Sequence, residues 1–327
     1  MPIFPYNSLP KSPTFHFEKF QSYNSHQTRP GSHRWKNAKK GLQFTVMTVG
    51  CPGLGRTTFI NTLCEKSVLP AVEVGSPETA HEEQPMTFKP YNVEMEEDGI
   101  KIAFTVIDTP GFGNGVNNEE HFKQIVHYLE SRYEETLAEE TRIKRNPKFK
   151  DNRVHALLYF ITPTGHGLRE LDIKLMKRVG NRVNVIPIIA KSDSLTVNEL
   201  RDFKKRVMED IDQFRIPIYN FPYDAEEDDE ETVEENKELR NLLPFAIVGC
   251  EEEVMHDDGS LLRVRNYPWG RVEIDNTEHC DFARLRFMLL NSHLSDLKEI
   301  THDILYENYR TEKLSDEQTG EPMAVDA

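Results

Sequence analysis

Residues 50–58 read Gly50-Cys51-Pro52-Gly53-Leu54-Gly55-Arg56-Thr57-Thr58, and this segment sets the fold class of the chain. It matches the phosphate-loop pattern G-x-x-x-x-G-K-[ST], except that Arg56 stands at the lysine position. Glycines let the backbone wrap closely around phosphates, so that N–H groups of the loop and of the next helix donate to the anion. The hydroxyl of Thr57 has the position that ligates Mg²⁺ in such loops. An ordinary glycine-rich turn between a strand and a helix is the alternative interpretation.

The segments on either side of this loop predict strands that alternate with helices. An apolar run at 42–50 predicts a central strand, and a helix is expected at 57–66. Asp98-Gly99 is typical of a hairpin, here between strands at 92–97 and 99–108. Apolar spacing further along predicts helices at 122–137 and 200–214 and strands at 154–161, 183–190 and 245–249. This order predicts an α/β fold with a doubly wound, mostly parallel sheet.

Two further motifs follow predicted strands, Asp108-Thr109-Pro110-Gly111 and Ala190-Lys191-Ser192-Asp193. A carboxylate at Asp108 can reach a Mg²⁺ shell, and the N–H of Gly111 can sense a γ-phosphate. Asp193 can accept hydrogen bonds from both the ring N–H and the amino group of guanine, whereas adenine lacks that pair of donors. The stem of Lys191 can cover the base. Taken singly, the first motif could be a plain turn and the second a helix cap. Their order predicts guanine-nucleotide binding, and a phosphate-loop enzyme for adenine nucleotides is disfavoured by Asp193.

With these motifs the chain resembles the septins, a family of filament-forming GTP-binding proteins. The resemblance covers about residues 39–310 and rests on further motifs, which are PTGHGL at 163–168, AKSDSLT at 190–196, LPFAIVG at 243–249, RNYPWG at 265–270 and DLKEIT at 296–301. It implies a GTPase-like sheet domain, a small β-rich and helical septin unique element, and assembly with other septin subunits into hetero-oligomeric rods. Gly55-Arg56-Thr57 and residues 208–212 resemble fungal septins at the rod ends.

The resemblance also implies roles for single residues. Gly249 would contact the guanine through its backbone, and Arg265 would flank the base. His166 and Trp269 would lie at a subunit contact across the nucleotide. A turn histidine and a half-buried packing tryptophan are the alternatives for these two. The implied cofactors are GTP or GDP with Mg²⁺, the metal being held by Thr57 and Asp108.

Two departures from the family pattern bear on hydrolysis. The guanidinium of Arg56 is bulkier than an ammonium and follows a γ-phosphate less well. The position where catalytic septins carry a threonine that helps hold Mg²⁺ and water aligns with Asn92, since Thr79 and Thr87 fit the register less well. Phosphoryl transfer depends on positioning and charge neutralisation. We therefore expect nucleotide binding with weak or absent hydrolysis, and a cycling GTPase switch is the alternative.

Charge is distributed unevenly along the 327 residues, whose formal net charge is −15. Residues 1–41 carry seven basic side chains against one acid, which predicts a flexible basic arm. Its cluster of Arg34, Lys36, Lys39 and Lys40 suits an anionic membrane surface, with a solvated linker as the alternative. A basic arm on an acidic body argues against general nucleic-acid binding. The nine acids between Asp224 and Glu235 are expected to form a solvated loop.

The remaining features bound the class of protein. No apolar run is long enough to span a membrane, no secretory signal is expected, and Cys51, Cys64, Cys250 and Cys280 lack metal-ligand spacing. The predicted divisions are the arm at 1–41, the GTP-binding domain at 42–250, the unique element with a C-terminal helix at 251–310, and a polar tail at 311–327 without coiled-coil heptads. The resemblance implies a cytoplasmic, cytoskeletal subunit of septin rings at sites of cytokinesis, septation or spore formation.

Overall fold

The computed structural model describes residues 42–70, 86–97, 99–113, 118–144, 146–147, 149–224, 228–255 and 261–319. The predicted basic arm, with Arg34, Lys36, Lys39 and Lys40, lies outside the described residues, as do residues 225–227 of the acidic run and the end of the polar tail. The described elements all belong to the unit that begins at Leu42.

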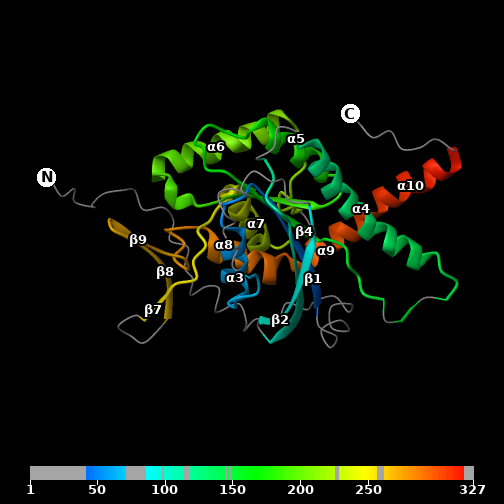
Figure 1. Cartoon of the computed structure of the whole chain (residues 1–327), viewed down its shortest axis with the longest axis horizontal. Helices are drawn as coiled ribbons and strands as arrows, with labels where there is room; N and C mark the ends of the chain where they lie inside the picture. Colours follow the sequence, from blue (N-terminus) through cyan, green and yellow to red (C-terminus); the bar gives the residue numbers. More distant parts are fainter. Residues whose placement is uncertain are drawn as a thin grey trace, which may run out of the picture. The chain divides into compact units, whose positions relative to one another are not determined.

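A sheet lies at the centre of this unit, with helices around it (Figure 1). It has six strands in the order β2-β3-β1-β4-β5-β6. Only β2 runs antiparallel to its neighbour, and the other pairs are parallel. The strands are β1 (Leu42–Gly50), β2 (Lys89–Glu97), β3 (Ile100–Asp108), β4 (Ala156–Ile161), β5 (Asn184–Ile189) and β6 (Phe245–Ala246). The predicted α/β fold with its one hairpin is therefore confirmed.

Each face of the sheet carries its own apolar core. Along β1, Phe44 and Val46 contribute to one core, whereas Met47 and Val49 contribute to the other. Both faces of a doubly wound parallel sheet are covered by helices, which explains why these strands are apolar throughout. One face is covered by α4 (Glu119–Glu140), α5 (Glu170–Val179) and α6 (Val197–Gln213). The other is covered by α3 (Arg56–Cys64), α7 (Glu230–Leu242), α8 (Phe282–Phe287), the short helix η3 (Met288–Ser292) and α9 (Leu294–Ile300).

The acidic run differs from its prediction as a loop, because its second half is helical. Asp229 caps α7, its side chain accepting a hydrogen bond of 2.7 Å from the backbone N–H of Thr232. Glu230 and Glu231 lie in the first turn, where the helix dipole favours negative charge. Val233 and Leu239 are buried on the inner face. The acidic side chains at the start of α7 therefore stabilise the helix in addition to adding surface charge.

The described part of the chain ends in a nearly continuous helical run that contacts α4. After α9 come η4 (Thr301–Tyr306) and α10 (Glu307–Thr319). Tyr306 and Tyr309 are buried against Tyr133 of α4, with ring centroids 5.6 and 5.3 Å away. The expected polar tail from residue 311 is therefore helical as far as Thr319.

A separate three-stranded antiparallel sheet confirms the predicted β-rich segment. It consists of β7 (Glu253–Met255), β8 (Leu261–Tyr267) and β9 (Gly270–Glu273) in sequential order. A two-residue turn, Pro268-Trp269, joins β8 to β9, since Tyr267 pairs with Gly270. The buried side chain of Val264 anchors this sheet.

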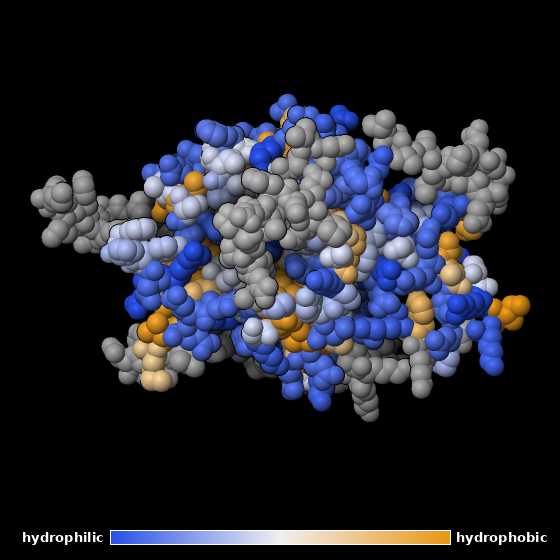
Figure 2. Space-filling model, viewed as in Figure 1, coloured by the Kyte–Doolittle hydropathy of each residue, from blue (hydrophilic) through white to orange (hydrophobic). Residues whose placement is uncertain are grey.

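The surface agrees with the acidic, polar composition. On the face shown in Figure 2, hydrophilic residues predominate and apolar residues occupy scattered areas. Among the helices of the described ranges, none is sufficiently long and apolar to cross a membrane.

Candidate nucleotide-binding site

The predicted phosphate loop connects β1 to α3. Gly55 is the N-cap of α3 and has φ 80° and ψ 26°, in the left-handed region that glycine adopts without strain. Because the loop joins the carboxyl end of β1 to α3, the free backbone N–H groups at the start of α3 lie at that end of the sheet, where a phosphate can accept from them. Thr57 and Thr58 lie in the first turn of this helix.

A pocket of about 170 Å³ lies beside this loop. Pockets for whole small molecules begin at about 300 Å³, so this one has the size for a base, with phosphates on the loop outside it. Apolar side chains form much of its wall, and the rest comes from the predicted motifs. Its lining residues are Leu54, Gly55, Thr58, Phe59, Phe160, Ala190, Lys191, Ile247, Gly249 and Arg265.

The predicted guanine-reading motif lies at the same end of the sheet. Lys191 follows β5 in the left-handed conformation (φ 47°), and Asp193 lies in the short helix η2 (Ser192–Ser194). The Cε of Lys191 is 3.9 Å from the point where a Cβ on Gly55 would stand, so its stem lies next to the loop. The carboxylate of Asp193 is only 6% exposed.

Gly249 allows the segment after β6 to approach α3. A Cβ at this position would lie 3.0 Å from the backbone nitrogen of Phe59 and 3.3 Å from a methyl group of Thr58. A larger residue at position 249 would push the segment after β6 away from α3. The structure thus brings Gly249, Thr58 and Lys191 together around one cavity.

Arg56 turns toward the second motif. Its Nη1 donates to the carbonyl of Thr109 at 2.7 Å and to the hydroxyl of Thr109 at 3.1 Å. The hydroxyl of Thr109 in turn donates to the carbonyl of Thr48 in β1. Burial lowers the pKa of Arg56, while the charge of Asp108 opposes this shift. The guanidinium is therefore fixed between the two loops.

Asp108 and Thr57 are the predicted metal ligands. Asp108 ends β3 and pairs across the parallel ladder with Thr48, two residues before the phosphate loop. Burial raises the pKa of Asp108, and the neighbouring charge of Arg56 offsets only part of this rise. A carboxylate and a hydroxyl suit Mg²⁺, which needs few protein ligands when phosphates supply others. Within the described ranges, no three His, Cys, Asp or Glu side chains gather as a metal cluster.

Gly111 brings the second motif into direct contact with the phosphate loop. A Cβ at Gly111 would lie 2.5 Å from the backbone nitrogen of Pro52 and 2.7 Å from its Cα. Backbone at this distance cannot move aside as a flexible side chain can. Gly111 and Pro52 therefore form a glycine-dependent contact between the two loops.

The alignment of Asn92 with a catalytic threonine is wrong. Asn92 lies inside β2 opposite Thr105, whereas Lys89 lies opposite Asp108. Three residues of strand separate the two pairs by about 10 Å. The Oδ1 of Asn92 accepts hydrogen bonds from the Thr105 hydroxyl and from Lys150 on the exposed side of the sheet. Thr87 precedes β2 and is nearer to the end of the sheet at which Asp108 lies, and Thr79 is outside the described residues.

The three-stranded sheet adds Arg265 to the lining of the pocket. Its Nε lies 3.8 Å from Oδ2 of Asp193. Trp269, in the adjoining turn, is 82% exposed, and its indole ring stacks on Tyr267. His166 is also exposed, in the loop before α5. The two predicted interface residues are thus on the surface, which rules out a half-buried Trp269.

Sequence reasoning misses two groups at this site. Tyr267 contacts Asp193 through a hydrogen bond, although the resemblance implies roles only for its neighbours in the RNYPWG motif. Arg169, which follows the PTGHGL motif, is fixed by two bonds of 2.8 Å to the buried Asp172 and donates to Sγ of Cys51 in the phosphate loop at 3.0 Å. A basic residue directly after that motif is the available signal for Arg169.

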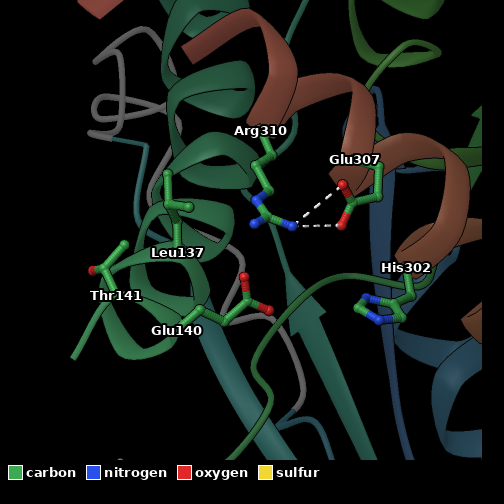
Figure 3. A pocket seen from close by; sticks show the side chains of 6 residues that line it. All are labelled: Leu137, Glu140, Thr141, His302, Glu307 and Arg310. Carbon is green, nitrogen blue, oxygen red and sulfur yellow. Dashed lines mark hydrogen bonds and ion pairs between the residues drawn. The ribbon is translucent and has the colours of Figure 1, made fainter. Parts of the chain in front are cut away.

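A larger pocket of about 320 Å³, lined by residues outside these motifs, lies between the end of α4 and the η4–α10 run (Figure 3). Its polar groups bond to one another or to neighbours. Arg310 donates to Glu307 at 3.1 Å, and Glu140 accepts from Tyr306 at 2.7 Å. The Tyr306–Glu140 bond joins η4 to α4, whereas the Arg310–Glu307 pair lies within α10.

Comparison with known proteins agrees with this geometry. The family model for septins matches residues 40–322. The septin homolog spn3 of Schizosaccharomyces pombe is 51% identical over 284 residues, covering 86% of this chain and 76% of its own. Cell division control protein 11 of Saccharomyces cerevisiae is 50% identical, covering 89% and 70%.

A solved structure supports the same assignment. The crystal structure of Cdc11 from Saccharomyces cerevisiae superposes with a TM-score of 0.57 at 40% identity, over 83% of this chain and all of that one. The fold, the phosphate loop and the guanine-reading motif agree with these matches. The chain therefore belongs to the septin family of filament-forming, guanine-nucleotide-binding proteins.

Proposed function

We propose that this septin is a subunit of division-site filaments in which the nucleotide is mainly structural. One observation carries the proposal. Arg265 of the three-stranded sheet lines the same pocket as the phosphate loop and Gly249. A base in this pocket therefore contacts both the GTPase-like core and the sheet whose turn exposes Trp269. Binding then orders a surface for assembly in addition to filling a pocket.

The proposed division of labour follows the predicted boundaries. Residues 42–250 would form the GTP-binding domain, and residues 251–310 would form the septin unique element with the helices behind it, from which Arg265 reaches the pocket. Gly50–Thr58, Gly111, Lys191, Asp193, Gly249 and Arg265 would contact the nucleotide, and His166 and Trp269 would contact a neighbouring subunit.

We propose that hydrolysis is slow because of the position of the Arg56 guanidinium. Bound GTP or GDP would supply the phosphates, with Thr57 and Asp108 as the protein ligands of Mg²⁺. Arg56 donates both of its hydrogen bonds to Thr109, so its charge is held toward Asp108. Phosphoryl transfer needs charge placed on the transferred group, and this placement is unfavourable for it.

The relatives' names support the proposed place of action. Two of them are called cell division control protein 11 and septation protein 7. We therefore place the chain with other septins in a ring or cortex at the division site; a role in spore formation is a further prediction. The basic cluster Arg34, Lys36, Lys39 and Lys40 would add affinity for anionic lipids. Flotation with anionic liposomes tests this, and unchanged binding after Lys36, Lys39 and Lys40 become Ala would contradict it.

Competition binding tests the nucleotide assignment. A fluorescent GDP bound to the full chain should be displaced by GDP and not by a hundredfold excess of ADP. Asp193→Asn should lose guanine nucleotides and gain xanthosine diphosphate, because the xanthine 2-oxo group accepts where guanine donates. Equal competition by ADP, or an unchanged preference in Asp193→Asn, would contradict the proposal.

A further inference from the structure

The carboxylate that should read guanine already has a protein partner. Tyr267, the last residue of β8, donates its hydroxyl to Oδ2 of Asp193. The guanidinium of Arg265 lies 3.8 Å from the same oxygen and 5.5 Å from the centre of the Tyr267 ring. One oxygen of Asp193 therefore serves a hydroxyl donor and a cation at once.

The hydroxyl of Tyr267 keeps its proton under cellular conditions. Burial, followed by the hydrogen bond to Asp193, raises its pKa to about 12. A neutral hydroxyl donating to a carboxylate makes a charge-assisted bond, about twice as strong as a bond between neutral groups. Tyr267 is thus a persistent partner of Asp193.

Guanine needs the same acceptor. Its ring N–H and its amino group bond to the two oxygens of one carboxylate, so both oxygens must accept from the base. Because the carboxylate of Asp193 is 6% exposed, water cannot replace a partner that is lost there. Oδ2 has two lone pairs, of which one accepts from Tyr267 and the other faces the Arg265 guanidinium 3.8 Å away. A base that enters the pocket therefore competes with these groups for Oδ2.

The competing tyrosine is connected to the exposed surface. Its ring stacks on the indole of Trp269, with centroids 5.2 Å apart and planes inclined by 9°. Trp269 is 82% exposed in a two-residue turn. A protein surface that covers the indole would therefore act on the phenol through this stack.

We propose that Tyr267 gates the guanine pocket: its hydroxyl holds Asp193 in competition with the base, and contact at Trp269 controls that hold. Tyr267 is thereby a positioning residue that sets nucleotide affinity. The inference deepens the proposed function of the same site and depends on it. It also gives a physical route by which assembly and nucleotide binding influence each other.

The test is Tyr267→Phe in the full chain, with GDP affinity measured by titration calorimetry. Phenylalanine keeps the ring on Trp269 and removes only the hydroxyl. GDP should bind about tenfold more tightly, which corresponds to about 1.4 kcal/mol. Tyr306→Phe is the matched control, since its hydroxyl also donates to a carboxylate, that of Glu140, and GDP affinity should not change.

A second variant, Trp269→Ala, tests the same proposal by a different substitution. Trp269→Ala removes the stack from an exposed position and should also tighten GDP binding. Combined with Tyr267→Phe it should add little, because both changes act through one hydrogen bond. Unchanged or weaker GDP binding by Tyr267→Phe, or fully additive effects, would overturn the gate.

These outcomes separate the gate from the nucleotide assignment. If the wild-type chain and Tyr267→Phe both prefer GDP over ADP and bind GDP equally, the gate fails and the assignment stands. If neither variant distinguishes GDP from ADP, the assignment itself fails.

Discussion

Arg56 shows how one side chain changes a loop whose backbone keeps its form. The glycines of residues 50–58 provide the turn, and Gly55 has the left-handed conformation that the helix start requires. The guanidinium, with several donors in a fixed plane, bonds to both the carbonyl and the hydroxyl of Thr109. A lysine at this position has a single charged group on a flexible stem. The residue type thus decides whether the charge faces Thr109 or a phosphate.

Arg56→Lys should therefore weaken the protein without nucleotide and strengthen nucleotide binding. Losing the bonds to Thr109 should lower the free energy of unfolding by about 1.5–3 kcal/mol, the range for hydrogen bonds to charged groups. The freed ammonium should raise GDP affinity about tenfold, because it can follow the phosphates as a compact charge. Urea unfolding and calorimetric titration measure the two effects.

Arg201→Lys is the matched control, because its side chain is 75% exposed on α6. It should leave both quantities unchanged. A fall in GDP affinity in Arg56→Lys would show that the guanidinium itself holds the phosphates, contrary to its two bonds with Thr109.

Among the elements, the helical run at the C-terminus depends on its contact with α4 more than on its own sequence. Tyr306 and Tyr309 pack on Tyr133, and Arg182 forms ion pairs with Glu130 and Glu312 at 3.0 and 2.7 Å. Beyond Tyr309 the residues are mostly polar, which is why their pattern indicates a tail. The partner surface lies on another element, so local periodicity cannot show it.

Tyr309→Ala should cost about 3 kcal/mol of unfolding free energy, because it removes a buried aromatic ring from this contact. Deletion of residues 311–327 should cost at most about 2 kcal/mol. The deletion removes the Glu312 and Lys313 ion pairs, whose carboxylates are about half exposed, and such pairs contribute little. Urea unfolding followed by circular dichroism compares the two variants. A deletion that destabilises more than Tyr309→Ala would contradict this ranking.

Two other elements show the same limit. The sequence pattern does not predict the short amphipathic helix α5, and it indicates a loop where α7 starts. In α7 the first turn is acidic, and its inner face has only Val233 and Leu239 as buried apolar residues. These acidic side chains accept hydrogen bonds from free backbone N–H groups or interact favourably with the helix dipole. A count of charges does not reveal this role.

For the whole molecule, two buried histidines tie stability to pH. His155 lies between β1 and β5, where its Nδ1 accepts the backbone N–H of Thr45 at 2.9 Å, and burial lowers its pKa to about 3. Burial also lowers the pKa of His293 to about 4. Both residues are neutral in the folded chain and bind protons on unfolding once the pH falls below their ordinary value of 6.5. Stability should therefore rise with pH between about 4 and 6.5.

Each histidine should contribute about 1.4 kcal/mol per pH unit to this slope. His155→Asn keeps an acceptor for Thr45 and cannot titrate, so its plot of unfolding free energy against pH should be shallower by that amount. Urea unfolding at about pH 7.5, 6.0 and 5.0 measures the slope across this range. His279→Asn, at an exposed acceptor of the Glu273 N–H, should leave it unchanged. Equal slopes in wild type and His155→Asn would refute the assignment.

Much of the fold and part of the site can be predicted from local patterns. The strand at 42–50, the phosphate loop after it and the hairpin near Gly99 follow from apolar spacing and glycine positions. The structure places Lys191, Gly249 and Arg265 around one pocket with the loop, and their contacts with a nucleotide stay a prediction. The prediction for Asn92 is wrong because its role depends on strand register, which the sequence specifies only through contacts with β3.

The sequence by itself therefore determined the class of the fold, the family and the end of the sheet where nucleotide binds. Tertiary structure alone decided what the charged and polar groups do there. Arg56 bonds to a residue 53 positions away, and Tyr267 to one 74 positions away. The physical reason is that backbone conformation and apolar periodicity are properties of neighbouring residues. The partner of a buried charge is chosen by the folding of distant segments onto one another.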